Sequence, residues 1–306
     1  MGDPLVDQLV AGCSGTVTAD APLSELTTLR VGGPVRALVR AESDEDLAAV
    51  GDAAEAHGVP TLVVGRGSNL LIGDLGWDGI AIVLGRGFRG VEIDPSTGRV
   101  RAGAAEPLPA LSVRVADAGL GGFAWAAAVP GSLGGAVRMN AGAHGGDISQ
   151  ALVEVEVFRL GSRVREVWAP SALELRYRHS NLPADGVVVA ATLAFASAAP
   201  DEVRDEIAEI RAWRREHQPL NEPNCGSVFT NPPGDSAGRL IDAAGAKGLR
   251  VGGAQVSERH ANFIVTQPGA RAADVLALID EVRARVRESA GIDLVPEVVV
   301  RGTGER

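Results

Sequence analysis

The sequence predicts an α+β protein made of three consecutive units, which we place at residues 1–80, 81–200 and 201–306. Its 306 residues are enough for two or three domains. Three observations favour this division: a strand–helix–strand pattern opens the chain, strands of alternating polarity fill its middle, and a long amphipathic helix precedes a last group of helices and strands. No internal repeat is visible.

The first unit is defined by one helix between short apolar strands. Ser43 is expected to cap this helix, acidic residues fill its first turn, and Gly58 followed by Pro60 ends it. The expected elements are a strand at 35–41, the helix at 43–58, and strands at 61–65 and 79–84.

The second unit contains a helix that begins near Pro107 and two strands that we expect to form a hairpin around Gly161-Ser162. The third unit starts with a helix whose N-terminal end is acidic and whose C-terminal end is basic, closed by Pro219. The expected elements are a helix at 107–122, strands at 151–160, 162–169 and 186–197, helices at 201–219 and 236–245, a strand at 261–266, a helix at 271–291 and a strand at 294–302.

Composition limits the classes of function. The net charge is −10 and the pI is near 5.1, which disfavours nucleic acid as the main partner. Two cysteines make no disulfide framework, so we expect a reduced, cytoplasmic setting. The start of the chain does not resemble a secretory signal, and no apolar run approaches the ~20 residues that span a bilayer. We assign no residue to a metal site.

Two glycine-rich segments are candidate ligand sites. The first, "GRGSN", follows an apolar strand, and its amide groups can form a nest for a pyrophosphate, although a simple β-turn has the same pattern. The second, "PGSLGGAVRMNAGAHGG", permits close approach of backbone to a ligand, although a glycine-rich packing helix with a loop would also fit. Two such segments together favour a shared dinucleotide site.

Three further residues carry candidate chemistry. Arg178 lies in the polar segment "YRHS", where a planar guanidinium suits a carboxylate, although most such arginines are merely solvated. Ser227 lies in a long loop rich in Asn, Pro and Gly, without the surroundings of a hydrolytic serine. Glu297 lies within an apolar stretch, where it either faces outward or, if buried, needs a partner or a proton.

Seven segments in order resemble the UDP-N-acetylenolpyruvoylglucosamine reductase (MurB) family. The resemblance extends from about residue 24 to 302, and its most specific block runs from "AGRLIDAAG" to "HANFIV". The other segments are "LRVGG", "GRGSNLL", "VPGSLGGAVRMNAGAHGG", "YRHS", "NCGSVFTNP" and "PEVVVRG".

The resemblance implies an FAD-binding fold of the vanillyl-alcohol-oxidase/PCMH type, with two subdomains that hold noncovalent FAD and a third that carries the substrate site. It implies reduction of an enolpyruvyl nucleotide sugar by NADPH, in peptidoglycan precursor synthesis. It implies Arg178, Ser227 and Glu297 as catalytic residues, with Ser227 as proton donor. The residues it implies for FAD are Gly65, Arg66, Gly67, Ser68, Asn69, Pro130, Gly131, Ser132, Gly134, Asn140, Gly142 and Ala143.

The chain also departs from the family's usual pattern. Thr230, Ala246 and His144 stand where many members have Lys, Leu and Tyr, and the first of these changes bears on substrate contacts. Ser227 follows Arg178 by 49 positions, and Tyr177 is the sole tyrosine, so we expect the short form of the enzyme, without a lid loop that carries a tyrosine. We expect a monomer with no nucleic-acid or membrane partner.

Two other functions share this pattern. A non-catalytic flavoprotein could use the same pocket to sense a nucleotide, and an oxidase of the same fold could hold a covalent flavin at His144 or Cys225. The joint presence of Arg178, Ser227 and Glu297 argues against the first alternative.

Overall fold

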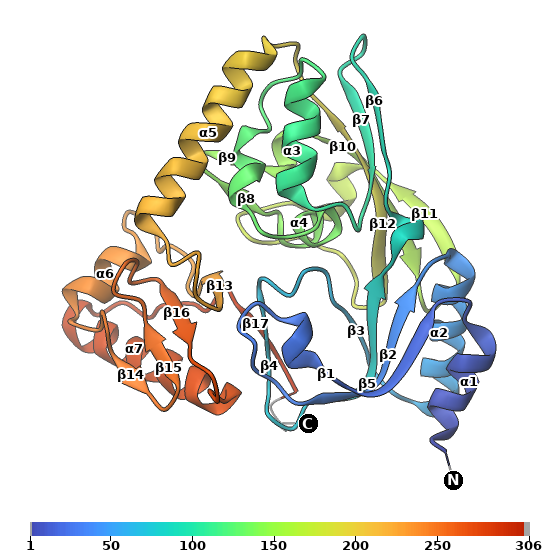
Figure 1. Cartoon of the computed structure of the whole chain (residues 1–306), viewed down its shortest axis with the longest axis horizontal. Helices are drawn as coiled ribbons and strands as arrows, with labels where there is room; N and C mark the ends of the chain where they lie inside the picture. Colours follow the sequence, from blue (N-terminus) through green and yellow to red (C-terminus); the bar gives the residue numbers. More distant parts are fainter. Residues whose placement is uncertain (1, 303–306) are drawn as a thin grey trace. The chain divides into compact units, whose positions relative to one another are not determined.

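The computed structural model describes residues 2–302, which form two compact units (Figure 1). The first unit comprises Met1–Asp20, Arg36–Arg66 and Gly79–Trp213, and the second comprises Ala21–Val35, Gly67–Asp78 and Arg214–Arg306. The three-domain division with boundaries at residues 80 and 200 stays a prediction. Strand β5, Trp77–Leu84, spans the first of these positions, and helix α5, Pro200–His217, begins at the second.

Two sheets lie largely in the first unit. One has the strand order β1-β2-β5-β3, and its strand β3 pairs with β5 in parallel. The other is antiparallel, with the order β11-β10-β12-β7-β6. The strands are β1 (Thr16–Pro22), β2 (Pro34–Ala41), β3 (Thr61–Val63), β6 (Val91–Asp94), β7 (Arg99–Gly103), β10 (Leu152–Arg159), β11 (Val164–Trp168) and β12 (Gly186–Ala194).

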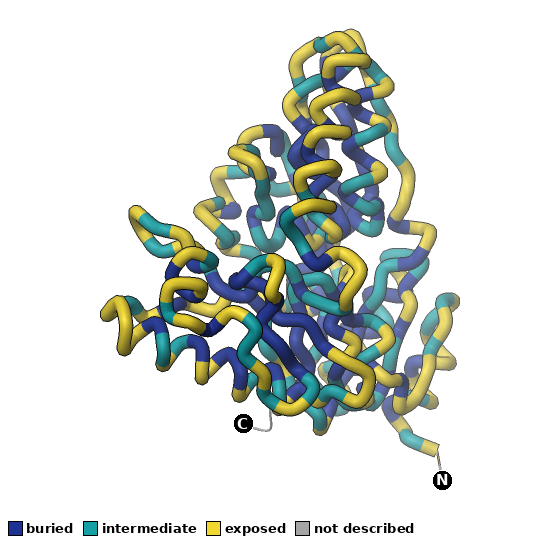
Figure 2. Tube along the Cα trace, turned by 60° about the vertical axis from the view of Figure 1, so that its left-hand side comes forward, coloured by how far each residue is buried: buried dark blue, intermediate teal, exposed yellow. Residues whose placement is uncertain are grey.

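Helices cover these sheets through apolar faces. Helices α1 (Pro4–Gly12) and α2 (Asp44–His57) bury Leu5, Leu9, Leu47 and Val50 in a core that also contains side chains of β2, β5, β10 and β12. Helices α3 (Leu108–Asp117) and α4 (Leu133–Met139) pack on the five-stranded sheet. Burying such apolar side chains is the main source of the unit's stability. Figure 2 shows the buried segments in dark blue, enclosed by exposed helix faces and loop tips.

The second unit is organised around a four-stranded sheet of order β13-β16-β15-β14. Helices α6 (Ala237–Ala243) and α7 (Ala272–Ala290) bury their apolar faces in its core. A separate pair of parallel strands, β4 with β17, joins the segment after "GRGSN" to the C-terminal segment. The strands are β4 (Leu70–Ile72), β13 (Asn224–Ser227), β14 (Arg250–Val251), β15 (Ala254–Val256), β16 (Phe263–Thr266) and β17 (Val299–Arg301).

Most expected elements are confirmed. Ser43 caps α2 by accepting a hydrogen bond from the Asp46 amide, and Gly58 ends the helix at φ +60°. The hairpin around Gly161-Ser162 is also present, as β10 and β11. The sequence prediction did not find α1, β1 or the β6–β7 hairpin. Local signals for α1 and the hairpin were present, since Asp3 caps α1 and the residues of β6 and β7 alternate in polarity, whereas β1 is mostly exposed and has little apolar pattern.

The expected strand at 294–302 is wrong in its first half. Strand β17 begins only at Val299, so Glu297 precedes the strand and does not lie inside it. Pro296 has no amide hydrogen to donate to a strand partner, and the Glu297 amide instead donates to Val228 O over 2.7 Å. The run of apolar residues therefore did not correspond to a continuous strand.

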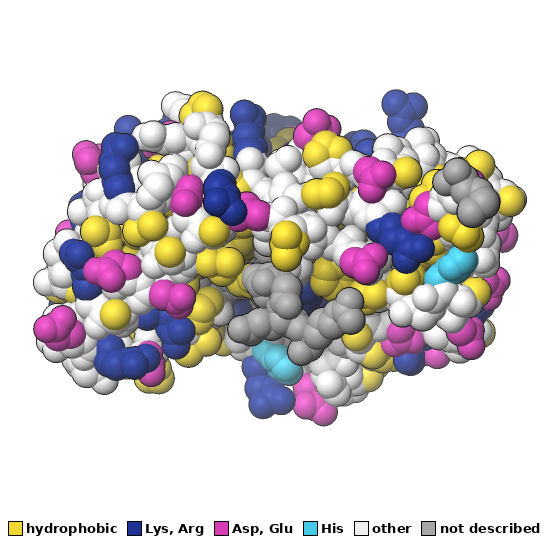
Figure 3. Space-filling model, turned by 90° about the horizontal axis from the view of Figure 1, so that it is seen from below, with side chains coloured by type: hydrophobic (Ala, Val, Ile, Leu, Met, Phe, Trp, Pro, Cys, Tyr) yellow, Lys and Arg dark blue, Asp and Glu magenta, His cyan; other side chains and the backbone are white. Residues whose placement is uncertain are grey.

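Charged groups are distributed on the surface in mixed signs. Basic and acidic side chains are interspersed on the face shown in Figure 3. Two arginines of the β10–β11 hairpin pair with carboxylates of α2: Arg163 with Asp52 over 2.8 Å, and Arg165 with Asp44 over 2.6 Å. Within residues 2–302, no helix is both long and apolar enough to cross a membrane.

The carboxylate of Asp46 joins the N-terminus of α2 to the turn between α1 and β1. It is 1% exposed and accepts hydrogen bonds from the Ser14, Gly15 and Glu42 amides and from the Ser14 hydroxyl, over 2.7–3.2 Å. Burial raises the pKa of this carboxyl, but the hydrogen bonds lower it further, so the pKa lies below its usual value. Asp46 is therefore a structural anion.

Replacing Asp46 by Ala should lower the free energy of unfolding by about 2–4 kcal/mol, because several buried donors lose their acceptor. Since the folded-state pKa is lowered, the contribution is present above about pH 4 and is lost as the pH falls through the folded-state pKa. Urea unfolding of both proteins between pH 7 and pH 3 measures the difference and its pH dependence.

The exposed Asp205 on α5 provides the matched control. Its replacement by Ala removes the same charge without a buried network, so the free energy of unfolding should change by less than about 0.5 kcal/mol. Equal effects of the two substitutions would contradict the structural role of Asp46.

Candidate active site

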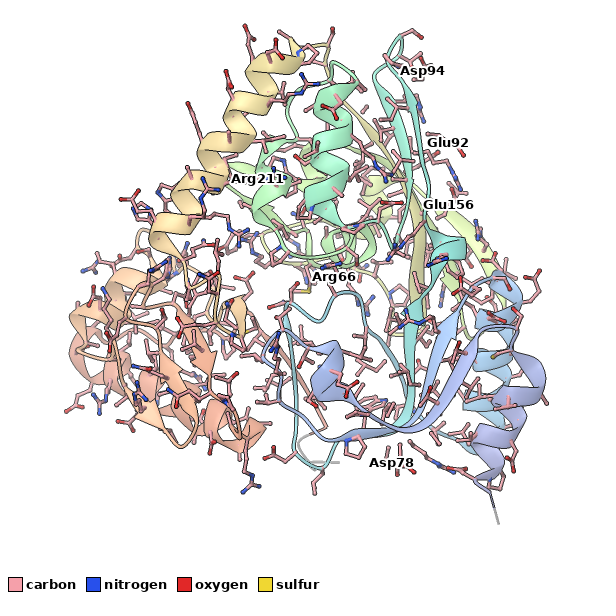
Figure 4. The ribbon with its side chains drawn as sticks, viewed as in Figure 1. Arg66, Asp78, Glu92, Asp94, Glu156 and Arg211 are labelled. Carbon is pink, nitrogen blue, oxygen red and sulfur yellow. The ribbon has the colours of Figure 1, made fainter. Side chains whose placement is uncertain are left out.

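The two glycine-rich segments meet within the first unit. Arg66 Nε donates to Pro130 O over 3.1 Å, and a Cβ on Gly65 would lie 2.7 Å from Ser132 Oγ. Figure 4 labels Arg66 on the loop that follows β3. Arg66 is exposed and forms no ion pair with a carboxylate of residues 2–302, so its positive charge is not neutralised. The two segments are therefore in contact, and their chemistry suits a phosphate; that they share a dinucleotide site stays a prediction.

Helix α4 and its two ends organise the second glycine-rich segment. Ser132 caps the helix by accepting from the Gly135 amide, and Asn140 ends it in the left-handed region at φ +39°. The buried Asn140 accepts from the Ser149 amide over 3.1 Å and donates to Arg176 O over 3.0 Å. Beyond it, Gly142 and Ala143 form strand β8, which pairs with β9, Gly146–Asp147. Asn140 therefore ties this segment to the one that carries Arg178.

Two of the predicted cofactor glycines are also required by the packing of the protein itself. A Cβ on Gly134 would lie 2.9 Å from Ala104 Cβ, and a Cβ on Gly67 would lie 1.9 Å from Leu26 O at φ +62°. Close contact with the Ala104 side chain at Gly134, and with the Leu26 backbone at Gly67, thus requires glycine at both positions. Gly135 differs, because it is exposed and its Cβ would make only an ordinary contact of 3.5 Å with Ser132 Oγ. Gly135 is the position where side-chain bulk would point away from the protein's own backbone.

Arg178 lies in a tight turn from Arg176 to His179, closed by reciprocal backbone hydrogen bonds of 3.1 and 3.0 Å. Its φ is +55°, at a turn position that favours glycine or asparagine. The guanidinium lies 4.8 Å from the centroid of the Tyr177 ring, and its Nη2 donates to Gly142 O over 2.8 Å. The first unit therefore brings Arg178 to the glycine-rich segment.

Ser227 ends strand β13 just after an irregularity in the strand pairing. The register shifts between Asn224 and Ser227, where Gly226 has a φ of +75°. Cys225 is buried in the core of the second unit, whereas Ser227 is half-buried. The Ser227 hydroxyl forms no hydrogen bond with another residue of the described chain. It is therefore available to a ligand.

The second unit brings Glu297 to Ser227 through the backbone. The Glu297 amide donates to the carbonyl of Val228, the residue after Ser227, over 2.7 Å. Asn69 Nδ2 donates to Glu297 O over 3.1 Å. In the second unit, the predicted site residues Gly67, Ser68 and Asn69 thus lie on the loop that holds Glu297. The predicted site residues Gly65, Arg66 and Arg178 belong to the first unit.

Asn262 supports the site but was not among the predicted residues. Its side chain accepts from the Phe229 amide over 2.9 Å and donates to Phe229 O over 2.8 Å, and its carbonyl accepts from the Val228 amide. These bonds fix the two residues that follow Ser227. Asn262 lies in the "HANFIV" segment that carries the family resemblance, and this was the only signal that pointed to it. A sequence pattern does not show with which distant backbone groups an amide side chain forms hydrogen bonds.

The three departures lie in different environments. Thr230 donates to Val295 O over 3.3 Å through its hydroxyl, and Ala246 is fully buried in the core. His144 is exposed, has a φ of +48°, and contacts Trp213 edge-on at 5.2 Å between ring centroids. The effect of these residues on substrate contacts stays a prediction.

The comparisons with known families define the class of this protein as an FAD-binding oxidoreductase. A family model described as "FAD binding domain" matches residues 35–167, and one described as "UDP-N-acetylenolpyruvoylglucosamine reductase, C-terminal domain" matches residues 218–301. A glucose dehydrogenase, Phl p 4.0202, shares the fold at a TM-score of 0.51 and 13% identity, over 65% of this chain and 45% of that one.

Proteins named UDP-N-acetylenolpyruvoylglucosamine reductase are similar over almost the whole chain. Those of Heliobacterium modesticaldum and Moorella thermoacetica are each 44% identical, over 96% and 98% of this chain and 94% and 98% of theirs. The crystal structure of the Thermus caldophilus enzyme (MurB) superposes with a TM-score of 0.79 at 39% identity, covering 94% of this chain and 98% of that one. The chain belongs to the UDP-N-acetylenolpyruvoylglucosamine reductase family, which confirms the resemblance and the predicted fold class.

Replacing Gly135 by Leu should lower the FAD content of the purified protein, because the side chain would fill space beside the exposed start of α4. Replacing it by Ala adds only an ordinary contact and should preserve FAD. The ratio of flavin to protein absorbance measures occupancy, and the melting temperature of the flavin-free proteins serves as the folding control. Full occupancy in Gly135→Leu would remove this segment from the cofactor site.

Proposed function

We propose that this protein reduces UDP-N-acetylglucosamine enolpyruvate to UDP-N-acetylmuramate, with NADPH as hydride donor and noncovalent FAD, in cytoplasmic synthesis of peptidoglycan precursors. One observation carries the proposal: in a chain of this family, the backbone of Glu297 is hydrogen-bonded to Val228, the residue after Ser227, and the Ser227 hydroxyl is available to a ligand. Arg178, Ser227 and Glu297 are proposed as the catalytic residues. A monomer remains our expectation for the oligomeric state.

The cofactor site consists of groups whose chemistry fits FAD. We assign to it Gly65, Arg66, Gly67, Ser68 and Asn69, where Arg66 supplies an unneutralised positive charge. When bound, FAD supplies transfer of a hydride from NADPH to the vinyl carbon C3 of the substrate. The second segment contributes Pro130, Gly131, Ser132, Gly134, Asn140, Gly142 and Ala143.

Arg178 stabilises the charge that develops on the substrate. Addition of hydride at C3 leaves an electron pair at C2, which delocalises into the adjacent carboxylate. A preorganised cation at that carboxylate lowers the barrier, and one well-aimed donor is worth roughly 2.7–4 kcal/mol in other enzymes. The Tyr177 ring and Gly142 O hold the guanidinium in place before substrate binds.

Ser227 and Glu297 complete the reaction. The Ser227 hydroxyl gives its proton to C2, which forms the new C–H bond, and the serine oxygen then recovers a proton from solvent. A free serine is a weak acid, but a positioned hydroxyl can protonate a strongly basic carbon centre. Glu297 acts in its protonated form, because a second carboxylate beside the anionic substrate would be repelled.

The structure bears on the alternative of a covalent flavin. Cys225 lies in the core of the second unit, and burial raises the pKa of its thiol to about 12. A buried, protonated thiol is a poor attachment point. His144 is exposed, so a covalent bond between this residue and the flavin needs a direct test. On acid precipitation of the protein, noncovalent FAD stays in the supernatant, whereas a covalent flavin precipitates with the protein.

The short form of the substrate site is also part of the proposal. Between Arg178 and Ser227 the chain forms only one long strand, β12, and one long helix, α5, apart from connecting segments. Neither carries a tyrosine. Oxidation of NADPH by the purified protein, with and without the enolpyruvyl nucleotide, tests the whole assignment, since no dependence on the nucleotide would exclude it.

Replacing Ser227 by Ala should separate the two halves of the reaction. The rate at which NADPH bleaches the flavin absorbance should stay within a few-fold of wild type, because Ser227 acts only after hydride transfer to the substrate. Recovery of the absorbance on adding substrate should slow about 10²- to 10⁴-fold, the usual contribution of a positioned acid. Stopped-flow absorbance measures both phases.

Ser227→Cys is the matched variant, because a thiol can also donate a proton, and it should retain part of the activity. If Ser227→Ala recovered absorbance at the wild-type rate, the proton would come from a bound water or from Glu297.

Replacing Arg178 by Lys should slow the substrate-dependent phase about 10- to 100-fold, because Lys keeps the charge but loses the planar fork. NADPH-dependent bleaching should change little. Arg176, in the same turn and 70% exposed at its side chain, is the control: Arg176→Lys should leave both phases within about twofold. Equal effects of the two substitutions would assign the loss to the turn and not to the guanidinium of Arg178.

A further inference from the structure

Three arginines of the described residues have a left-handed backbone: Arg30, Arg163 and Arg178. Arg163 is paired with carboxylates of α2, and Arg30 lies in the segment Leu26–Val31 of the second unit, which we call the strap. Three contacts hold its backbone. Thr27 Oγ1 donates to Val31 O over 3.2 Å, the Thr28 amide donates to Gly67 O over 3.1 Å, and Thr266 Oγ1 donates to Leu29 O over 2.6 Å. The strap is therefore fixed on both sides of Arg30.

Arg30 has a φ of +54°. In this region the Cβ of an L residue crowds the following carbonyl, so glycine and asparagine are the residues usually found there. Glycine is available to the chain close by, since Gly32 and Gly33 follow directly. A long cationic side chain in a conformation that disfavours it is the kind of local strain that accumulates at functional sites.

The positive charge of Arg30 is not used within the protein. The residue is exposed, and its guanidinium forms no hydrogen bond or ion pair with any of residues 2–302. The chain has 39 acidic and 29 basic residues, and the arginines Arg159, Arg163 and Arg165 of the β10–β11 hairpin are all paired with carboxylates. An unpaired arginine fixed by its backbone in an acidic protein is well suited to an external anion.

The strap borders the proposed site within the same unit. Thr28 binds Gly67, and the same loop continues to Asn69, which binds the carbonyl of Glu297. Thr266 ends β16, the strand that pairs with β13 and places Phe263 opposite Ser227. One hydrogen-bonded scaffold therefore supports Arg30, the loop Gly67–Asn69 and Ser227.

We propose that Arg30 is an anion-binding residue whose guanidinium takes a phosphate group of a nucleotide ligand. The proposal rests on the proposed function, whose three ligands each carry phosphate: the diphosphate of FAD, the phosphates of NADPH and the diphosphate of the nucleotide sugar. A guanidinium forms two parallel, charge-assisted hydrogen bonds with phosphate oxygens. Binding to this group offsets the backbone strain at Arg30.

The test compares three variants of the FAD-bound enzyme. Arg30→Asn removes the charge and tolerates the left-handed backbone, so its melting temperature should equal or exceed that of wild type. Arg30→Lys keeps the charge. Arg250→Asn removes one exposed charge from β14, at the opposite edge of the sheet from β13, and Arg250 has no positive φ.

For each variant we would measure retention of FAD on repeated ultrafiltration, the KM for NADPH, and the KM for the enolpyruvyl nucleotide. Arg30→Asn should weaken one ligand about 10- to 100-fold, the effect of losing charge-assisted hydrogen bonds. Arg30→Lys should stay within about fivefold of wild type, and Arg250→Asn within about twofold. The ligand that is weakened identifies which phosphate Arg30 binds.

Raising the salt concentration should reduce the difference between wild type and Arg30→Asn, because salt screens an exposed charge. If Arg30→Asn left all three ligands within twofold, or if Arg250→Asn weakened them equally, Arg30 would be an ordinary surface arginine. Failure of the proposed function has a different signature, since wild type itself would not turn over the enolpyruvyl nucleotide. In that case FAD retention, and the rise in melting temperature caused by NADPH or by uridine diphosphate, would still decide the role of Arg30.

Discussion

The second unit depends on one short loop, Gly67–Asn69, whose backbone joins three segments that are far apart in the sequence. Gly67 O accepts from the Thr28 amide, Asn69 O accepts from the Val299 amide, and Asn69 Nδ2 donates to Glu297 O. A side chain at Gly67 would collide with Leu26 O. These contacts hold together the strap, the loop and the segment from Glu297 to Val299 that leads into β17. Ser227 is linked to them because the Glu297 amide donates to the carbonyl of Val228, the next residue.

This arrangement explains why a polar, glycine-rich loop can carry chemistry. Loops are normally mobile, because their backbone groups bind water rather than protein. Here hydrogen bonds from the backbone and from amide side chains replace bonds to water. The side chain of Asn262, for example, accepts from the amide of Phe229 and donates to its carbonyl. The hydroxyl of Ser227, our proposed proton donor, is left without such a partner among the described residues, so the surrounding backbone is ordered while this hydroxyl stays available to a ligand.

Several residues near the proposed site adopt a conformation that sequence rules assign to glycine. Asn140, Arg178 and Arg30 have φ values of +39°, +55° and +54°. Asparagine is tolerated there, but each arginine costs about 1–2 kcal/mol relative to glycine. The cost is accepted where the side chain has a use, and in Arg178 the Tyr177 ring and Gly142 O show how the guanidinium is then held. The proposal for Arg30 therefore rests on its backbone conformation together with its unpaired charge, and not on a sequence pattern.

The sequence by itself determined the elements with strong local signals, and also the family. Ser43, the acidic first turn and Gly58 specify α2 locally, since caps act on backbone groups within three or four residues. The motifs that carry the family resemblance likewise lie in short contiguous stretches. Strand β1 carries only a weak local signal, because most of its residues are exposed, and it forms because it pairs with β2. Helix α1 and the β6–β7 hairpin were missed although the Asp3 cap and the alternating residues of both strands were visible in the sequence.

Only the tertiary structure decided how the site is supported. Glu297 was expected inside a strand, but its amide binds Val228 O instead, a contact between residues 69 positions apart. The bond from Arg178 to Gly142 O and the contact of Gly65 with Ser132 are of the same kind. Sequence patterns report what neighbouring residues prefer, whereas these contacts depend on where the packed elements bring distant backbone groups, and that is fixed only when the cores form.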